Sequence, residues 1–144
     1  MEIMRFIKTT LLYMFGIVSG MLFKYLGGYD DFLKTLLIFM AFDIITGSIV
    51  AAVFKRSNKT DTGGAGFRAG FVGLLKKGCM LIVVIIAVLL DQIMHTNELT
   101  RDAVLIAFMI GELISILENM SIMGIKMPKA MSDAVELLTH KKHG

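Results

Sequence analysis

Four long apolar segments divide the chain, over residues 7–26, 32–54, 73–94 and 103–123. Each is close to the ~20 residues that a helix needs to cross ~30 Å of hydrocarbon. The third contains the unbroken apolar run CMLIVVIIAVLL. The pattern therefore predicts an all-α integral membrane protein, with four transmembrane helices in one membrane domain over residues 1–126.

Composition supports a lipid environment. Of the 144 residues, 56% are hydrophobic and only 19% are charged, against about 25% in soluble domains. The mean hydropathy is +0.73. A soluble core of this size could not hide so much apolar surface. A single cysteine, Cys79, excludes an internal disulfide and leaves the redox compartment undetermined.

The first apolar segment could belong to a signal peptide, because Arg5 and Lys8 precede it. No clear small-x-small cleavage site follows, and three more hydrophobic segments do. We therefore expect an uncleaved first span.

The charges between the segments predict an orientation. Residues 55–77 carry six basic residues against one acid, whereas the other two connections are nearly balanced. By the positive-inside rule this loop and both termini are cytoplasmic, which makes the chain N-in and C-in. This distribution of charge suits an anionic inner leaflet better than nucleic acid. The basic residues expected at the membrane surface are Lys55, Arg56, Lys76, Lys77, Lys129, Lys141 and Lys142.

The segment 127–144 has a different pattern. Pro128 sits where the first turn of a helix tolerates it. One helical face then collects the apolar residues Met127, Ala130, Met131, Ala134, Val135 and Leu138. This pattern predicts an amphipathic cytoplasmic helix that lies at the membrane surface and is too polar to cross it. Packing of the same face against a partner is the alternative.

Enzymatic and metal-binding patterns are weak. His140 and His143 lack a third ligand, and nearby lysines make them part of a solvated tail. The run GGAGFRAGFVGLLKKG fails the phosphate-loop pattern, because Cys79 follows where that pattern ends. We expect no enzyme activity, no cofactor and no metal.

Small residues indicate where helices could approach one another. In the first segment Gly16, Ser19 and Gly20 share one face, a pattern typical of helix packing in lipid. Gly70 and Gly73 would form a similar strip if the third helix begins early. Flexibility of a cytoplasmic loop explains this second pair equally well.

The fourth segment, GELISILENMSIMGIKMP at residues 111–128, is apolar yet carries two carboxylates. Glu112, Ser115 and Asn119 share one helical face, and Glu118 lies on its flank. A similar short strip on the second segment is formed by Asp43, Thr46 and Gly47.

A carboxylate at mid-bilayer costs ~2.5 kcal/mol or more, so its presence implies a polar partner or a path for water. One interpretation is that these strips join helices by hydrogen bonds. The other is that they face each other, or face water, once subunits assemble.

Two blocks of sequence resemble the phage holins labelled toxin secretion/phage lysis holins. The first is FDIITGSIVAAVFK followed by glycines and a Lys-Lys pair, and the second is GELISILENMSIMGIKMP. Lys126 and Met127 depart from the family's pattern, which has an apolar residue and a proline there. The matching positions are Asp43, Thr46, Gly47, Lys55, Gly73, Lys77, Glu112, Ser115, Glu118, Asn119, Gly124 and Pro128.

The resemblance implies a homo-oligomeric holin of the bacterial inner membrane, without catalysis. Such proteins form lesions that release a cell-wall hydrolase, the endolysin, or a large toxin. Two alternatives stay open. One is a small ion or proton channel or transporter that uses Glu112 and Asp43 as ligands. The other is an antiholin that restrains a partner holin.

Cysteine-accessibility labelling tests the orientation. Cysteines replacing Asn58 and Lys141 are expected to react from the cytoplasm, and cysteines replacing Tyr29 and Asn97 from outside, because the basic residues gather around the first pair. Labelling of Asn58→Cys from outside would overturn both the orientation and the four-span count.

Overall fold

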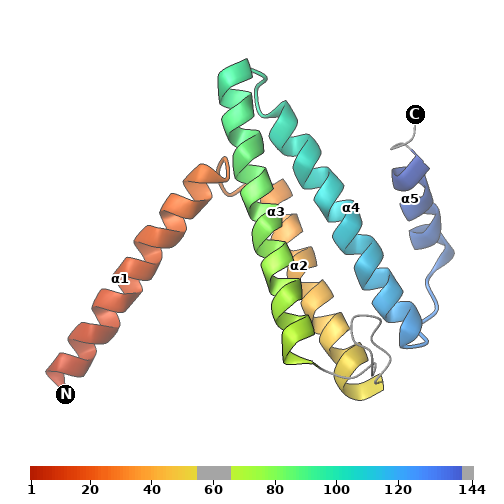
Figure 1. Ribbon diagram of the computed structural model, residues 1–144, viewed down its shortest axis with the longest axis horizontal. Helices are drawn as coiled ribbons and strands as arrows, with labels where there is room; N and C mark the ends of the chain where they lie inside the picture. The colour runs from red at the N-terminus through yellow and green to blue at the C-terminus, as the bar shows by residue number, and fades with distance from the viewer. Residues whose placement is uncertain (55–65, 141–144) are drawn as a thin grey trace.

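The computed structural model describes residues 1–54 and 66–140, and every element in this part is helical (Figure 1). Four stretches are long and apolar enough to cross a membrane. The predicted all-helical class with four candidate spans is therefore confirmed, and the N-in/C-in orientation stays a prediction. The elements are α1 Glu2–Tyr25, α2 Asp31–Ile49, the π-helix η1 Val50–Phe54, α3 Phe67–Met94, α4 Leu99–Ile122 and α5 Lys129–His140.

The helices extend beyond the apolar segments. The third begins at Phe67 rather than near residue 73, and the fourth at Leu99 rather than near 103. The apolar segments show which residues tolerate contact with lipid. The helices continue beyond them into the membrane interface, because unpaired backbone N–H and C=O groups still cost free energy there. Of the basic residues expected at the membrane surface, Lys55, Arg56, Lys141 and Lys142 lie outside the described residues.

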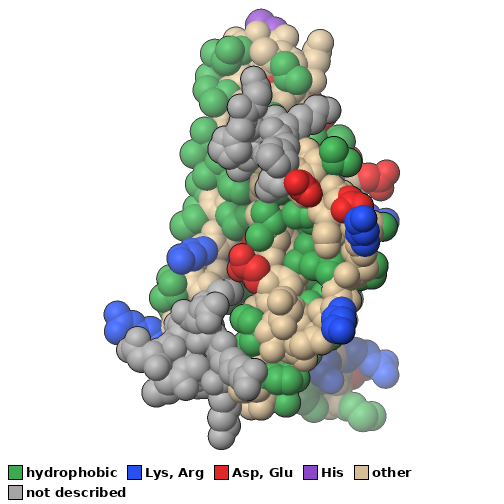
Figure 2. Space-filling view, turned by 90° about the vertical axis from the view of Figure 1, so that its right-hand side faces the viewer, with side chains coloured by type: hydrophobic (Ala, Val, Ile, Leu, Met, Phe, Trp, Pro, Cys, Tyr) green, Lys and Arg blue, Asp and Glu red, His purple; other side chains and the backbone are tan. Residues whose placement is uncertain are grey.

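Helices α2, α3 and α4 form a bundle in which α4 packs chiefly against α2. Its core contains Leu26, Leu33, Leu36, Met40, Val84 and Leu105. Helix α1 leaves the bundle at an angle, and none of its residues is buried (Figure 1). Figure 2 shows hydrophobic side chains over much of the visible face, with scattered charged groups between them. Such a surface is what a bilayer accepts.

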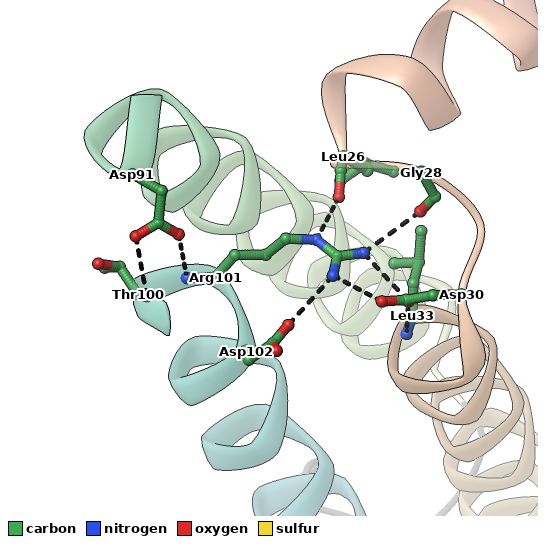
Figure 3. Close-up of polar contacts among 8 residues, drawn as sticks. All are labelled: Leu26, Gly28, Asp30, Leu33, Asp91, Thr100, Arg101 and Asp102. Atoms are coloured by element: carbon green, nitrogen blue, oxygen red, sulfur yellow. Dashed lines mark hydrogen bonds and ion pairs between the residues drawn. The ribbon is translucent and has the colours of Figure 1, made fainter. Parts of the chain in front are cut away.

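The end of the bundle that holds the α1–α2 and α3–α4 turns, here called the two-turn end, is organised by one arginine. The Arg101 side chain is 0% exposed, and its guanidinium binds both carboxylate oxygens of Asp30 at 2.7 and 3.0 Å. It also donates to the carbonyls of Leu26 and Gly28, at 2.7 and 3.3 Å, and to Asp102 at 3.1 Å (Figure 3). Arg101 of α4 thus holds the α1–α2 turn in place.

The neighbouring turn is held by Asp91 of α3. Its carboxylate accepts the backbone N–H groups of Thr100 and Arg101, at 2.9 and 2.8 Å (Figure 3). It also accepts the Thr96 hydroxyl. Glu98 occupies the N-cap position of α4 in a left-handed conformation and forms no side-chain cap there. An acid of the preceding helix therefore satisfies the free N–H groups at the start of α4.

Asp30 also accepts the backbone N–H of Leu33 at 2.9 Å, which caps the start of α2. The hydrogen bond from Arg101 holds the pKa of Asp30 below the ordinary value of an aspartate. Because folding lowers this pKa, Asp30 contributes its full stabilisation when the pH is above the ordinary pKa of an aspartate. This stabilisation is lost as the pH falls through the lowered pKa.

Gly27 and Gly28 offer a matched test of this turn. Both have positive φ, 84° and 99°, so an alanine at either position strains the backbone. A Cβ on Gly27 would also lie 2.5 Å from Nε of Arg101, whereas a Cβ on Gly28 meets nothing within 4 Å. We expect Gly27→Ala to lower the melting temperature in detergent micelles clearly more than Gly28→Ala does. Equal losses would contradict the tight fit around Arg101.

Candidate functional site

One lysine and two carboxylates meet inside the bundle. Nζ of Lys77 on α3 lies 3.0 Å from Oδ2 of Asp43 on α2 and donates a hydrogen bond to Oε2 of Glu112 on α4. The three residues are only 6–8% exposed. We call Asp43, Lys77 and Glu112 the buried ionic cluster. Each of the three packed helices contributes one charge to it.

Uncharged polar side chains also bond Asp43. Its Oδ1 accepts the Ser115 hydroxyl at 2.5 Å and the Asn119 amide at 3.1 Å. The same amide donates to Oγ1 of Thr46 at 3.0 Å, and it would lie 3.6 Å from a Cβ added to Gly47. The polar strips predicted on the second and fourth segments thus face each other within a single chain.

The position of Lys77 corrects an expectation. We placed it at the membrane surface with Lys76, yet Lys77 is buried and ion-paired whereas Lys76 is exposed. Consecutive residues of a helix point about 100° apart, so one lysine of the pair turns inward and the other outward. A count of loop charges cannot predict which of the two lysines points into the bundle.

The cluster lies toward the end of the bundle opposite the two-turn end. Asp43 is 12 residues from the start of α2, Glu112 is 13 from the start of α4, and Lys77 is 17 from the end of α3. At 1.5 Å per residue these separations are about 18, 20 and 26 Å. In a hydrocarbon layer of ~30 Å the cluster is therefore well inside the helices but off centre.

Among the described residues, the ammonium of Lys77 contacts the carboxylates of both Asp43 and Glu112. Inside a low-dielectric bundle, pairing and hydrogen bonding hold such groups, and removing one partner is costly. The arrangement can join three helices while they stay dry, and it can bind water or cations if the helices separate.

The other predicted site residues lie apart from the cluster. Glu118 is exposed and lines a groove of about 430 Å³ between α4 and α5. A Cβ added to Gly16, Gly20, Gly70 or Gly73 meets nothing within 4 Å.

The Ser19 hydroxyl bonds within its own helix, to the carbonyl of Phe15 at 2.7 Å. Lys129 is exposed at the start of α5. Among the described residues there is no group of three side chains placed to hold a metal.

Sequence reasoning missed the roles of Lys77, Asp30 and Arg101. For Lys77 a signal was present in the spacing of α3. Lys77, Val84, Val88 and Asp91 recur at intervals of seven, four and three residues and are all buried. That spacing marks one helical face. No comparable signal links Asp30 to Arg101, because the two residues are 71 positions apart in the chain.

Comparison with known proteins identifies relatives over most of the chain. An uncharacterized protein of Listeria monocytogenes is 36% identical over 129 residues, which cover 88% of this chain and 86% of the relative. An uncharacterized 14.9 kDa protein of Clostridium perfringens is 34% identical over 130 residues, covering 88% of this chain and 92% of the relative. No solved structure matches the chain.

A protein of Bacillus phage phi105 carries a functional name. It is described as a probable holin and is 31% identical over 114 residues, covering 79% of this chain and 78% of the relative. Residues 20–140 match the profile of the bacteriophage holin family, a range that includes the whole buried ionic cluster and both turns of the two-turn end. With its four apolar helices, the chain is a multi-pass membrane protein that belongs to the bacteriophage holin family.

Proposed function

We propose that this chain is a holin. It accumulates in the inner membrane of a bacterial host, with both ends in the cytoplasm, and assembles with further copies of itself into a lesion. An endolysin, or in some settings a large toxin, then leaves through that lesion. An antiholin is a possible further partner. The observation that carries this proposal is the buried ionic cluster, found in a chain of the holin family.

The cluster suggests how one sequence suits both lipid and a wet assembly. In a single subunit Lys77 pairs with Asp43 and Glu112, so none of these charges meets lipid. Opening the cluster in lipid would cost several kcal/mol, because it would leave buried charges without partners. If helices of neighbouring subunits separate around water, hydration replaces the lost pairs.

The same cluster supports a second candidate, a small ion or proton channel or transporter. Carboxylates inside a membrane bundle are common on ion and proton pathways. The two functions differ in what crosses the membrane. A holin lesion passes a folded enzyme, whereas a channel or transporter shows selective ion flux. Expression of the chain in bacteria together with an endolysin distinguishes them, since only the first produces abrupt lysis that depends on the enzyme.

Glu112 and Glu118 form a matched pair for this assay. Glu112→Gln keeps the size of the side chain and its ability to bond Lys77, but it removes one negative charge from the cluster. We expect it to delay or abolish lysis while the protein still reaches the membrane and assembles. Glu118→Gln changes an exposed residue outside the cluster and should lyse cells on nearly the normal schedule. Culture density with time and quantitative membrane blots are the measurements.

Comparison of Glu112→Leu with Glu112→Gln separates the effect of the charge from that of the hydrogen bond. Glu112→Leu removes both, so we expect weaker oligomers in chemical cross-linking as well as impaired lysis. If Glu112→Gln behaves as wild type and Glu112→Leu weakens the oligomers, Glu112 acts only as a contact between helices. Normal lysis by both variants would remove the cluster from the mechanism and leave the holin assignment resting on family membership.

We further propose that the C-terminal segment adjusts the timing of lysis. Helix α5 follows Pro128 and lies against the end of α4, across the groove that contains Glu118. Its apolar face should hold it at the inner surface of the membrane, with Lys129 near anionic headgroups.

Deletion of residues 129–144 tests this role. We expect lysis to begin at a shifted time, with membrane insertion and oligomers preserved, because none of the described contacts of the ionic cluster or the two-turn end involves the deleted residues. A truncated chain that fails to insert or to oligomerise would show that the segment builds the assembly rather than tuning it.

A further inference from the structure

Lys76 stands out in the described part of α3 because no described acid accompanies it. Its neighbour Lys77 turns into the buried ionic cluster, whereas Lys76 is exposed on the side of α3 that faces α4. Among the residues that the structure describes, Lys76 forms no ion pair. A lysine within a membrane-spanning helix, without a carboxylate beside it, requires an anion or water from outside the chain.

An apolar groove begins at Lys76. It has a volume of about 340 Å³ and runs between α3 and α4. Lys76 is the only charged side chain among its described lining residues, which are otherwise Val72, Leu75, Cys79, Met80, Val83 and Phe108. From Lys76 to Val83 the lining extends over about 10 Å of helix toward the centre of the span. The groove thus places the Lys76 ammonium at one end of an apolar surface that is open to lipid.

The length of α3 fixes the depth of this ammonium. The helix has 28 residues and is about 42 Å long, which exceeds the ~30 Å of hydrocarbon. If its last residue, Met94, marks one boundary of the hydrocarbon, the other boundary falls about 20 residues earlier, at Leu75. Lys76 is then at the level where acyl chains end and phosphate groups begin, and Val83 is among the chains.

We propose that the α3–α4 groove binds one anionic phospholipid from the leaflet at the N-terminal end of α3. The headgroup phosphate meets the ammonium of Lys76, and one acyl chain lies along Cys79, Val83 and Phe108. Charge complementarity selects an anionic lipid, because the described lining of the groove offers a cation and no acid to receive the amine of a zwitterionic headgroup. This inference depends on the membrane location of the chain and not on lesion formation.

Native mass spectrometry of the purified full chain tests the proposal. The protein is released from micelles that contain equal amounts of dioleoylphosphatidylglycerol and dioleoylphosphatidylcholine. We expect one phosphatidylglycerol to be retained in preference to phosphatidylcholine. Lys76→Gln should reduce this preference about fivefold, the effect of one basic residue at an anionic surface. The control Lys34→Gln removes an exposed lysine near the start of α2 and should keep the preference.

A second pair of variants tests the acyl-chain half of the groove. Val83→Trp fills the groove without changing charge and should reduce retention of both lipids. Ile93→Trp enlarges a residue that is 75% exposed on the same helix and should not. Circular dichroism checks that all four variants keep the helix content of the wild type.

Four results would overturn the proposal. The first is an unchanged lipid preference in Lys76→Gln, and the second is an equal loss in Lys34→Gln. The third is release of the lipid by millimolar inorganic phosphate, which would indicate a site for the phosphate group alone. Retention by Val83→Trp equal to that of Ile93→Trp would show that the lipid does not occupy the groove.

Discussion

The contact of the Lys77 ammonium with two carboxylates is the constraint on which the bundle depends. Asp43, Lys77 and Glu112 come from three helices, and each would be costly to insert into hydrocarbon alone. Together they remove that cost and fix the rotation of α2, α3 and α4 about their axes. Apolar packing in lipid cannot do this, because lipid tails contact leucine and valine side chains as readily as another helix does.

Most of the fold could be predicted from the sequence, because segment length and apolarity are local properties. The polar strips of α2 and α4 were also predictable, since residues such as Glu112 and Asn119 share a face by helical spacing alone. Their contact with Lys77 could not be predicted. Lys77 was expected at the surface because it ends a basic loop, and only the rotation of α3 turns it inward.

The two ends of the bundle use charge differently. At the two-turn end the Arg101 guanidinium forms five hydrogen bonds, to Asp30, Asp102 and two backbone carbonyls, and this arrangement suits a permanent joint. In the buried ionic cluster the described contacts join the Lys77 ammonium to two carboxylates, and a hydroxyl and an amide also donate to Asp43. The chain thus joins its helices by charge at two levels, at the turns and inside the membrane-spanning bundle.

The bonds from Arg101 to the carbonyls of Leu26 and Gly28 also order events during synthesis. The α1–α2 turn leaves the ribosome about 70 residues before Arg101 does. Its two carbonyls therefore lack the Arg101 hydrogen bonds until α4 has been synthesised. The first half of the chain is therefore inserted without its final joint. Assembly of α2 with α4 becomes the step that completes the subunit, and a newly made chain has no finished form to contribute to an assembly before that moment.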